Sequence, residues 1–204
     1  MDALARRRYD GHSAPRCEPL GRTTRGDGAG ERSAARKFDM TSPARIHQIN
    51  VNPKGGVPKH RVERATLSPE GVSGDKQRNL RYHGGPLRAV CLYSLERLQA
   101  LAAEGHPIAP GTTGENLTVS GLDWDALQLG DRLRVGAALL ELTDYAPPCQ
   151  QIRRSFAESD FTRMAQKLHP GWSRIYAQVL EPGTVTEGDA VHHVPANVSA
   201  PERG

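Results

Sequence analysis

Short apolar segments separated by turns rich in glycine, proline and aspartate occupy residues 45–194, and they constrain the fold more than any other feature of the chain. With 21 glycines and 15 prolines, the chain favours many short elements over a bundle of long helices. The alternating segment 45–51 (RIHQINV) and the segment 127–143 (LQLGDRLRVGAALLELT) are typical of strands joined by turns. The sequence therefore predicts a mostly β fold, a barrel or a sandwich, with a few helices.

Two segments carry helical periodicity. Ser94 is a candidate N-cap for a helix that continues through LERLQALAA and ends near Gly105, with its leucines on one face. Residues 151–172 form an amphipathic pattern that predicts a second helix, ending near a Pro-Gly pair. Residues 173–194 predict two further strands around the turns EPG and EGD.

The two ends of the chain differ in composition from the domain predicted at 45–194. Residues 1–39 lack hydrophobic periodicity and contain nine Lys and Arg against six Asp and Glu, which accounts for +3 of the net charge of +4. We expect this extension and the tail at 195–204 to be disordered, because neither can bury enough apolar surface to offset its ordering entropy. Translation starting at Met40 is one hypothesis for the extension; a basic targeting arm is the alternative, although a transit peptide should be poor in acids.

Composition and cysteine spacing narrow the class of protein. The chain has 204 residues, of which 37% are hydrophobic and 25% charged, and it contains no apolar run long enough to span a membrane. Cys17, Cys91 and Cys149 are widely spaced, so we expect reduced thiols in the cytoplasm rather than disulfides or a structural zinc site. The net charge of +4 is too small to indicate nucleic-acid binding.

Four glycine-rich segments, at 53–59, 71–79, 82–90 and 110–117, place polar residues beside glycines, which allow close approach of the backbone. Each segment alone is explained as a tight turn, and none has the spacing of a P-loop or of a GxGxxG motif. Together they could form a pocket in which cations and backbone N–H groups bind phosphate or pyrophosphate. The candidate residues are Lys59, Asp75, Lys76, Arg78, His83, Arg88, Glu115 and Asn116.

The three cysteines are predicted to have different roles. Cys91 lies within the apolar run RAVCLYS and is expected in the core, whereas Cys17 falls in the extension. Cys149 follows two prolines, which fix the backbone and remove two N–H donors. A thiolate presented there could bind a soft metal or attack an electrophile, and a cysteine that merely ends a turn is the alternative.

The ordered set of segments resembles the MOSC domain family, named for the C-terminal domain of molybdenum cofactor sulfurases. The matching pieces, spread over about residues 46–194, are GGVPK, GVSGDKQ, YHGGPLRAVCLYS, PGTTGENLT, LQLGDRLRVG, YAPPC and the ending GW…VLEPGTVTEGD. Each piece is weak alone, but their order is specific. The opening and the ending are most similar to stand-alone bacterial members that reduce N-hydroxylated bases such as 6-hydroxylaminopurine.

This resemblance implies a MOSC-type β-barrel that binds a molybdenum cofactor of the molybdopterin type, with Cys149 as catalytic residue and metal ligand. It implies cofactor contacts from Lys59, Asp75, His83, Gly84, Arg88, Glu115 and Asn116. The implied activity is reduction of N-hydroxylated bases or related compounds with electrons from a separate reductase. The alternative is a carrier that holds sulfur as a persulfide on Cys149, or hands over the cofactor, without turnover. A full sulfurase would need a preceding pyridoxal-phosphate domain, so we expect no pyridoxal phosphate, and no nucleic-acid or membrane partner.

Overall fold

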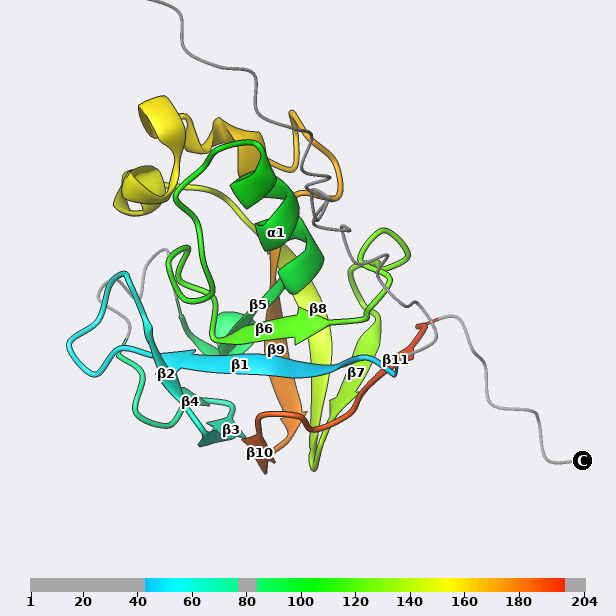
Figure 1. Ribbon diagram of the computed structural model, residues 1–204. Helices are drawn as coiled ribbons and strands as arrows, with labels where there is room; N and C mark the ends of the chain where they lie inside the picture. The colour runs from blue at the N-terminus through cyan, green and yellow to red at the C-terminus, as the bar shows by residue number, and fades with distance from the viewer. Residues whose placement is uncertain (1–42, 77–83, 197–204) are drawn as a thin grey trace, which may run out of the picture. The chain divides into compact units, whose positions relative to one another are not determined.

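The computed structural model describes residues 43–76 and 84–196, and this part of the chain is built mainly from strands (Figure 1). The prediction of a mostly β fold with a few helices is confirmed. The extension 1–39 and most of the tail 195–204 lie outside the described residues, so their disorder stays a prediction. The strands are β1 Arg45–Val51, β2 His60–Val62, β3 Arg64–Ser68, β4 Gly71–Val72, β5 Val90–Ser94, β6 Leu117–Ser120, β7 Arg132–Val135, β8 Ala138–Ala146, β9 Arg174–Glu181, β10 Gly183–Thr186 and β11 Val191–Val194.

Eight strands form the main sheet in the order β11-β7-β8-β9-β5-β6-β1-β2, and β10, β3 and β4 form a second sheet. β5 and β6 run parallel, and α1 (Leu95–Ala103) lies in the connection between them (Figure 1). A parallel pair cannot be joined by a hairpin, so the chain has to cross over at this point. The segment 173–194, predicted as two strands, contains β9, β10 and β11, because β10 leaves the main sheet to pair with β3.

The main sheet is not closed into a barrel, and this part of the predicted fold is wrong. β2 lies at one edge of the sheet beside β1, and β11 lies at the other edge beside β7. The start of β1 meets the segment that leads into β11 through the isolated bridge between Arg45 and Ala190 and a few backbone hydrogen bonds, such as that from the N–H of Val191 to the carbonyl of Ala44, but β1 and β11 form no ladder. The alternation of apolar residues along a strand indicates its buried face, but it does not indicate whether the edges of a sheet meet.

An irregularity in β1 explains a pattern that simple alternation does not. Ile46 and Ile49 are three residues apart, so a regular strand would point them to opposite faces. Both are buried, because the pairing of β1 with β6 shifts register between Ile46 and Gln48, as in a β-bulge. The end of β1 is buried as well, and the N–H of Asn50 donates to the carbonyl of Asn116 at 2.7 Å. The bulge thus brings the end of β1 against the loop that precedes β6.

The helix α1 begins and ends as predicted. The Ser94 hydroxyl accepts a hydrogen bond from the N–H of Arg97 at 3.3 Å, which satisfies one of the unpaired donors at the helix start. Leu98 and Leu101 are buried, and Gly105, with φ of 94°, follows the last turn.

The helix predicted over 151–172 is instead a series of short 3-10 helices. These are η2 Gln150–Ser155, η3 Ala157–Ser159 and η4 Phe161–Met164, in addition to η1 Pro86–Arg88 earlier in the chain. Glu158 and Ser159 have positive φ, which a continuous right-handed helix does not allow. The apolar periodicity was nevertheless informative, since Ile152, Phe156 and Met164 are buried in the core.

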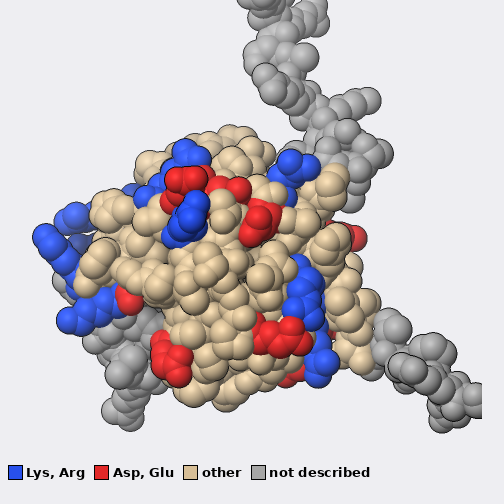
Figure 2. Space-filling view, turned by 90° about the horizontal axis from the view of Figure 1, so that it is seen from below, with Lys and Arg blue, Asp and Glu red and all other residues tan. Residues whose placement is uncertain are grey.

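The core carries the stability of this part of the chain, and the surface carries charges of both signs. Many strand residues of both sheets are fully buried, among them Leu67, Leu92, Leu117, Leu133 and Leu140. Figure 2 shows acidic and basic side chains interspersed in the upper and lower right parts of one face, with basic side chains gathered at its left edge. Among the described residues, no helix is both long enough and apolar enough to cross a membrane.

Candidate functional site

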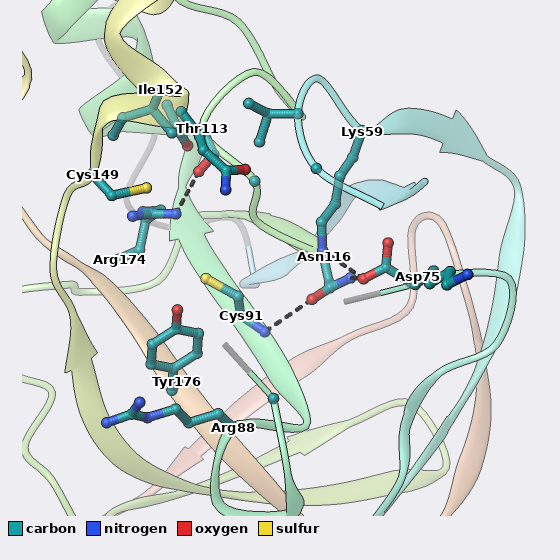
Figure 3. Close-up of a pocket in the computed structure, with 16 residues that line it drawn as sticks. Lys59, Asp75, Arg88, Cys91, Thr113, Asn116, Cys149, Ile152, Arg174 and Tyr176 are labelled. Carbon is teal, nitrogen blue, oxygen red and sulfur yellow. Dashed lines mark hydrogen bonds and ion pairs between the residues drawn. The ribbon is translucent and has the colours of Figure 1, made fainter. Parts of the chain in front are cut away.

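A pocket brings together segments that lie far apart in the sequence (Figure 3). The loop after β1, the segment after β4, the loop before β6, the residues after β8 and the strands β5 and β9 all contribute to its lining. Figure 3 shows Lys59, Asp75 and Asn116 on one side of this pocket and Cys149, Arg174 and Cys91 on the other. The residues predicted from four separate glycine-rich segments therefore do converge, with the exceptions given below.

Cys149 lines the pocket and stands directly after the two prolines that follow β8. It has an extended backbone, with φ of −139° and ψ of 167°, and η2 begins at the next residue. The thiol is free, half-buried and part of the pocket lining. Because Pro147 and Pro148 carry no N–H group, the strand ladder cannot continue through them, and the chain leaves the sheet at this step. The Pro-Pro step thus separates Cys149 from β8 and places its sulfur toward the pocket (Figure 3).

Asp75 is the centre of a polar cluster on the opposite wall. Its carboxylate accepts from Lys59 Nζ at 2.6 Å, from Asn116 Nδ2 at 2.9 Å and from the N–H of Asn52 at 2.7 Å. The side chains of Lys59 and Asp75 are only 11% and 4% exposed, so this is an ion pair largely removed from water. We call Lys59, Asp75 and Asn116 the Asp75 cluster.

Asn116 ties the Asp75 cluster to the sheet. Its side-chain oxygen accepts from the N–H of Cys91 at 3.2 Å, and its own N–H donates to the Cys91 carbonyl at 2.7 Å. Its side-chain nitrogen also donates to the carbonyl of Asn50 at 3.3 Å. A buried amide with this many partners has one orientation, so the position of the cluster relative to β1 and β5 is set by Asn116.

Glu115, predicted as a cofactor contact, is fully buried but is not part of the pocket lining. Its carboxylate accepts from the N–H of Gly111, from the hydroxyl of Thr113 at 2.6 Å and from that of Thr118 at 3.2 Å. These bonds hold the loop before β6 in shape. Its observed contacts are therefore those of a residue that supports the site, and its direct contact with a cofactor stays a prediction.

Gly84 and Arg88 line the pocket, as the glycine-rich segments suggested. Arg88 Nη2 donates to Asp144 Oδ2 at 2.8 Å, and its guanidinium lies 5.5 Å from the centre of the Tyr176 ring. Arg78 and His83 lie outside the described residues, so their predicted roles stay predictions. Lys76, at the other side of the segment 77–83, is exposed and also lines the pocket.

Sequence reasoning missed Arg174, which stands at the start of β9 and is 5% exposed. Its Nη1 donates to the carbonyl of Thr113 and its Nη2 to the carbonyl of Pro147 at 3.3 Å. The guanidinium thus links the loop before β6 to the segment that carries Cys149. An arginine within the otherwise apolar run RIYAQVL was the available signal, because a charged side chain is seldom buried without a specific reason.

Cys91 was predicted in the core, and it is buried, but it also lines the pocket. It forms a small cluster with Ala146 and Tyr176, apart from the main core. Burial raises the pKa of the Cys91 thiol, and it also raises the pKa of the Tyr176 hydroxyl. Both groups therefore keep their protons at neutral pH and can act as hydrogen-bond donors.

A family model for the MOSC domain matches residues 79–192, which is more than half of the chain, and the chain therefore belongs to the MOSC domain family. Cys149, Asn116, Cys91 and Arg174 lie within the matched region. Lys59 and Asp75 lie before it, and they reach the pocket through the pairing of β1 with β6 and through Asn116.

The chain is similar to two curated bacterial proteins. It is 29% identical to the uncharacterized protein YflK of Bacillus subtilis (strain 168) over 160 residues. This match covers 78% of this chain and 72% of YflK. It is 32% identical to the protein YiiM of Escherichia coli (strain K12) over 149 residues. This match covers 68% of this chain and 65% of YiiM.

Solved structures show the same fold. The crystal structure of YiiM from Geobacillus stearothermophilus matches with a TM-score of 0.59 and 25% identity over 78% of each chain. The structure of YiiM from Escherichia coli matches with a TM-score of 0.54 and 26% identity, covering 76% of this chain and 72% of that one.

Proposed function

We propose that this protein binds a molybdenum cofactor of the molybdopterin type in the pocket, through Cys149, and reduces N-hydroxylated bases or related N-oxygenated compounds. The observation that carries the proposal is that the free Cys149 thiol and the Asp75 cluster line one pocket, although they come from distant parts of the chain. Membership of the MOSC domain family supplies the chemical context for this arrangement.

The donor set of the pocket fits a cofactor that brings its own metal ligands. Within 43–76 and 84–196, no group of three or more His, Cys, Asp and Glu side chains is placed to hold a bare metal ion. Molybdenum bound by a dithiolene accepts one further soft ligand, and Cys149 offers a sulfur in the pocket lining. Lys59, Lys76 and Arg88 line the same pocket and favour the phosphate of such a cofactor.

The residues of the chain would hold and orient the reactants. When bound, the cofactor supplies two-electron chemistry at molybdenum. Cys149 would hold the metal, and Lys59, positioned by Asp75, would bind the anionic part of the cofactor. Cys91 and Tyr176, which keep their protons because burial raises the pKa of each, can donate hydrogen bonds to an oxygen of the substrate.

Reduction of an N–OH group to an amine takes two electrons and two protons, breaks the N–O bond and releases water. The described residues contain no strand–GxGxxG–helix unit for a dinucleotide, so the proposal includes a separate reductase as electron donor. The free thiols of Cys91 and Cys149 suit a reducing compartment, and we place the reaction in the cytoplasm.

Metal analysis of protein made in a cofactor-competent host tests this proposal. We expect about one molybdenum per chain in the unaltered protein, and at least a tenfold loss in Cys149→Ser, because a hydroxyl is a much poorer ligand than a thiolate for soft coordination. Cys17→Ser is the matched control, because Cys17 lies in the extension before the domain, and it should retain the metal.

Two outcomes would contradict the proposal. If Cys149→Ser keeps both the metal and the reduction of 6-hydroxylaminopurine, Cys149 is not the ligand. If the unaltered protein carries no molybdenum but releases cyanide-labile sulfur that depends on Cys149, the protein is a persulfide carrier instead.

A further inference from the structure

The proposed function makes no use of the charge on Arg174. This side chain lines the pocket, and in Figure 3 it lies between Cys149 and Cys91. Its two hydrogen bonds, to the carbonyls of Thr113 and Pro147, are made by Nη1 and Nη2. The third nitrogen of the guanidinium, Nε, makes no hydrogen bond.

Across the described parts of the chain, Arg174 forms no ion pair with a carboxylate, and its buried Nε has no hydrogen-bond partner. Asp75 pairs with Lys59 and Asp144 pairs with Arg88. The buried Glu115 carboxylate acts on Arg174 electrostatically, but its hydrogen bonds go to Gly111, Thr113 and Thr118 and not to the guanidinium. A buried charge is unfavourable unless an opposite charge or a full set of acceptors compensates it. Two carbonyl groups compensate only part of a guanidinium, which has five N–H donors.

Arg174 cannot remove this imbalance by losing its proton. A guanidinium keeps its proton at any pH at which the protein is folded, and burial, which by itself lowers the pKa of Arg174, does not change this. The pocket therefore has a permanent positive charge with an unused donor in its lining.

We propose that Arg174, with the Cys91 thiol beside it, forms a subsite for one oxyanion group of a small molecule, such as a carboxylate or a phosphate. A ligand oxyanion would accept a hydrogen bond from the unused Nε–H and place a negative charge in contact with the guanidinium. The anionic end of the ligand would lie beside Arg174, and the rest of the molecule would extend toward the exposed Lys76. This subsite does not depend on molybdenum, so it stands or falls separately from the proposed function.

An NMR titration of the full chain tests the subsite. We prepare ¹⁵N-labelled protein in a host that cannot make the pterin cofactor, and titrate it with sodium formate or with inorganic phosphate against sodium chloride at equal ionic strength. The Nε–H resonance of Arg174 is assigned by its absence in Arg174→Gln. We expect one of the two anions to shift this resonance in a saturable way. Arg174→Gln should bind that anion at least tenfold more weakly, the factor expected for loss of one charge-assisted hydrogen bond.

Two further variants keep the test decisive. Arg163→Gln is the matched control, because Arg163 is a partly buried arginine that pairs with Glu104, stacks on Trp172 and does not line the pocket. It should bind like the unaltered protein. Cys91→Val adds bulk beside Arg174 without changing it, and should weaken binding even where Arg174→Gln fails to fold.

The two anions distinguish the source of the oxyanion. Saturation by formate indicates a planar carboxylate-type group, as on a substrate, whereas saturation by phosphate indicates a tetrahedral group, as on a cofactor. The proposal is overturned if neither anion moves the Arg174 resonance beyond the chloride control, or if binding is equal in unaltered protein and in Cys91→Val. Retention of molybdenum by Cys149 would be unaffected by that result.

Discussion

On one wall of the pocket, the carboxylate of Asp75 accepts hydrogen bonds from Lys59, Asn116 and the backbone of Asn52. On the other, the guanidinium of Arg174 is held by two carbonyl groups and has an unused Nε. The first wall is complete without a ligand, because each charge meets an opposite charge. On the second wall, the charge of Arg174 has no ion-pair partner among the described residues, and its Nε–H has no acceptor. The difference suggests that the Asp75 cluster shapes the pocket and fixes the Lys59 amine there for the proposed cofactor, whereas the Arg174 wall has a donor left for a further group.

The largest effect on stability is expected from Asp75→Ala. This change leaves Lys59 as a buried, unpaired cation and removes a partner of Asn116, and loss of one member of a buried pair costs about 3–5 kcal/mol. Urea denaturation measures the free energy of unfolding directly. Asp75→Asn keeps one acceptor oxygen and the size of the side chain but not its charge. It is the control, and its free energy of unfolding should fall less than that of Asp75→Ala. If Asp75→Ala costs under about 1 kcal/mol, the exposed-pair value, the cluster does not shape the pocket as described.

Gly111→Ala should come next, because it disturbs the loop that backs the Asp75 cluster. Gly111 has φ of 84°, and a Cβ atom there would lie 2.5 Å from the carbonyl oxygen of Lys59. We expect a loss of about 2–5 kcal/mol, from left-handed strain of about 1–2 kcal/mol and overpacking of about 1–3 kcal/mol. Gly188→Ala separates the two causes, because Gly188 has φ of 90° but open space around it. Equal losses in the two variants, measured by the same denaturation, would show that the close approach to Lys59 is unimportant.

The smallest effect is expected from Arg174→Met, on the incomplete wall. Two carbonyls lose a partner, at about 1–3 kcal/mol each, but the protein no longer buries an uncompensated charge, which is often worth about 1–4 kcal/mol. At the middle of these ranges, a loss of about 4 kcal/mol from the two carbonyls against a gain of about 2.5 kcal/mol leaves a net loss of unfolding free energy of about 1–2 kcal/mol. A loss as large as that of Asp75→Ala would remove the contrast between the two walls and make Arg174 a structural residue. Thermal unfolding of both variants side by side gives this comparison.

Local patterns were sufficient to predict most strands and the helix capped by Ser94. They also singled out Cys149 as the thiol presented after two prolines. They also indicated that Lys59, Asp75, Arg88 and Asn116 belong to one site, and the structure does bring these residues to one pocket. Glu115 shows the limit of such reasoning, since its neighbour Asn116 faces the pocket whereas its own carboxylate holds the loop. Adjacent residues point in different directions, and their composition does not reveal which one meets the ligand.

The failures have a common physical cause, which is that they depend on contacts between distant segments. The open sheet depends on where β2 and β11 end relative to each other, and neither strand carries a signal for that. The segment 151–172 has the apolar spacing of a helix, yet it forms separate 3-10 turns while still burying Ile152 and Met164. Arg174 was overlooked because its importance lies in the carbonyls of Thr113 and Pro147, which are 61 and 27 residues away along the chain.

The sequence by itself determined the class of fold, the position of the turns and the presentation of Cys149 after two prolines, because these follow from backbone preferences and from periodicity over a few residues. Only the tertiary structure decided which polar groups meet. It paired Lys59 with Asp75, turned Glu115 away, brought Cys91 to the pocket wall and left Arg174 with an unused donor. Such pairings depend on the distance and burial of groups that are remote in sequence, and these quantities exist only once the sheet has formed.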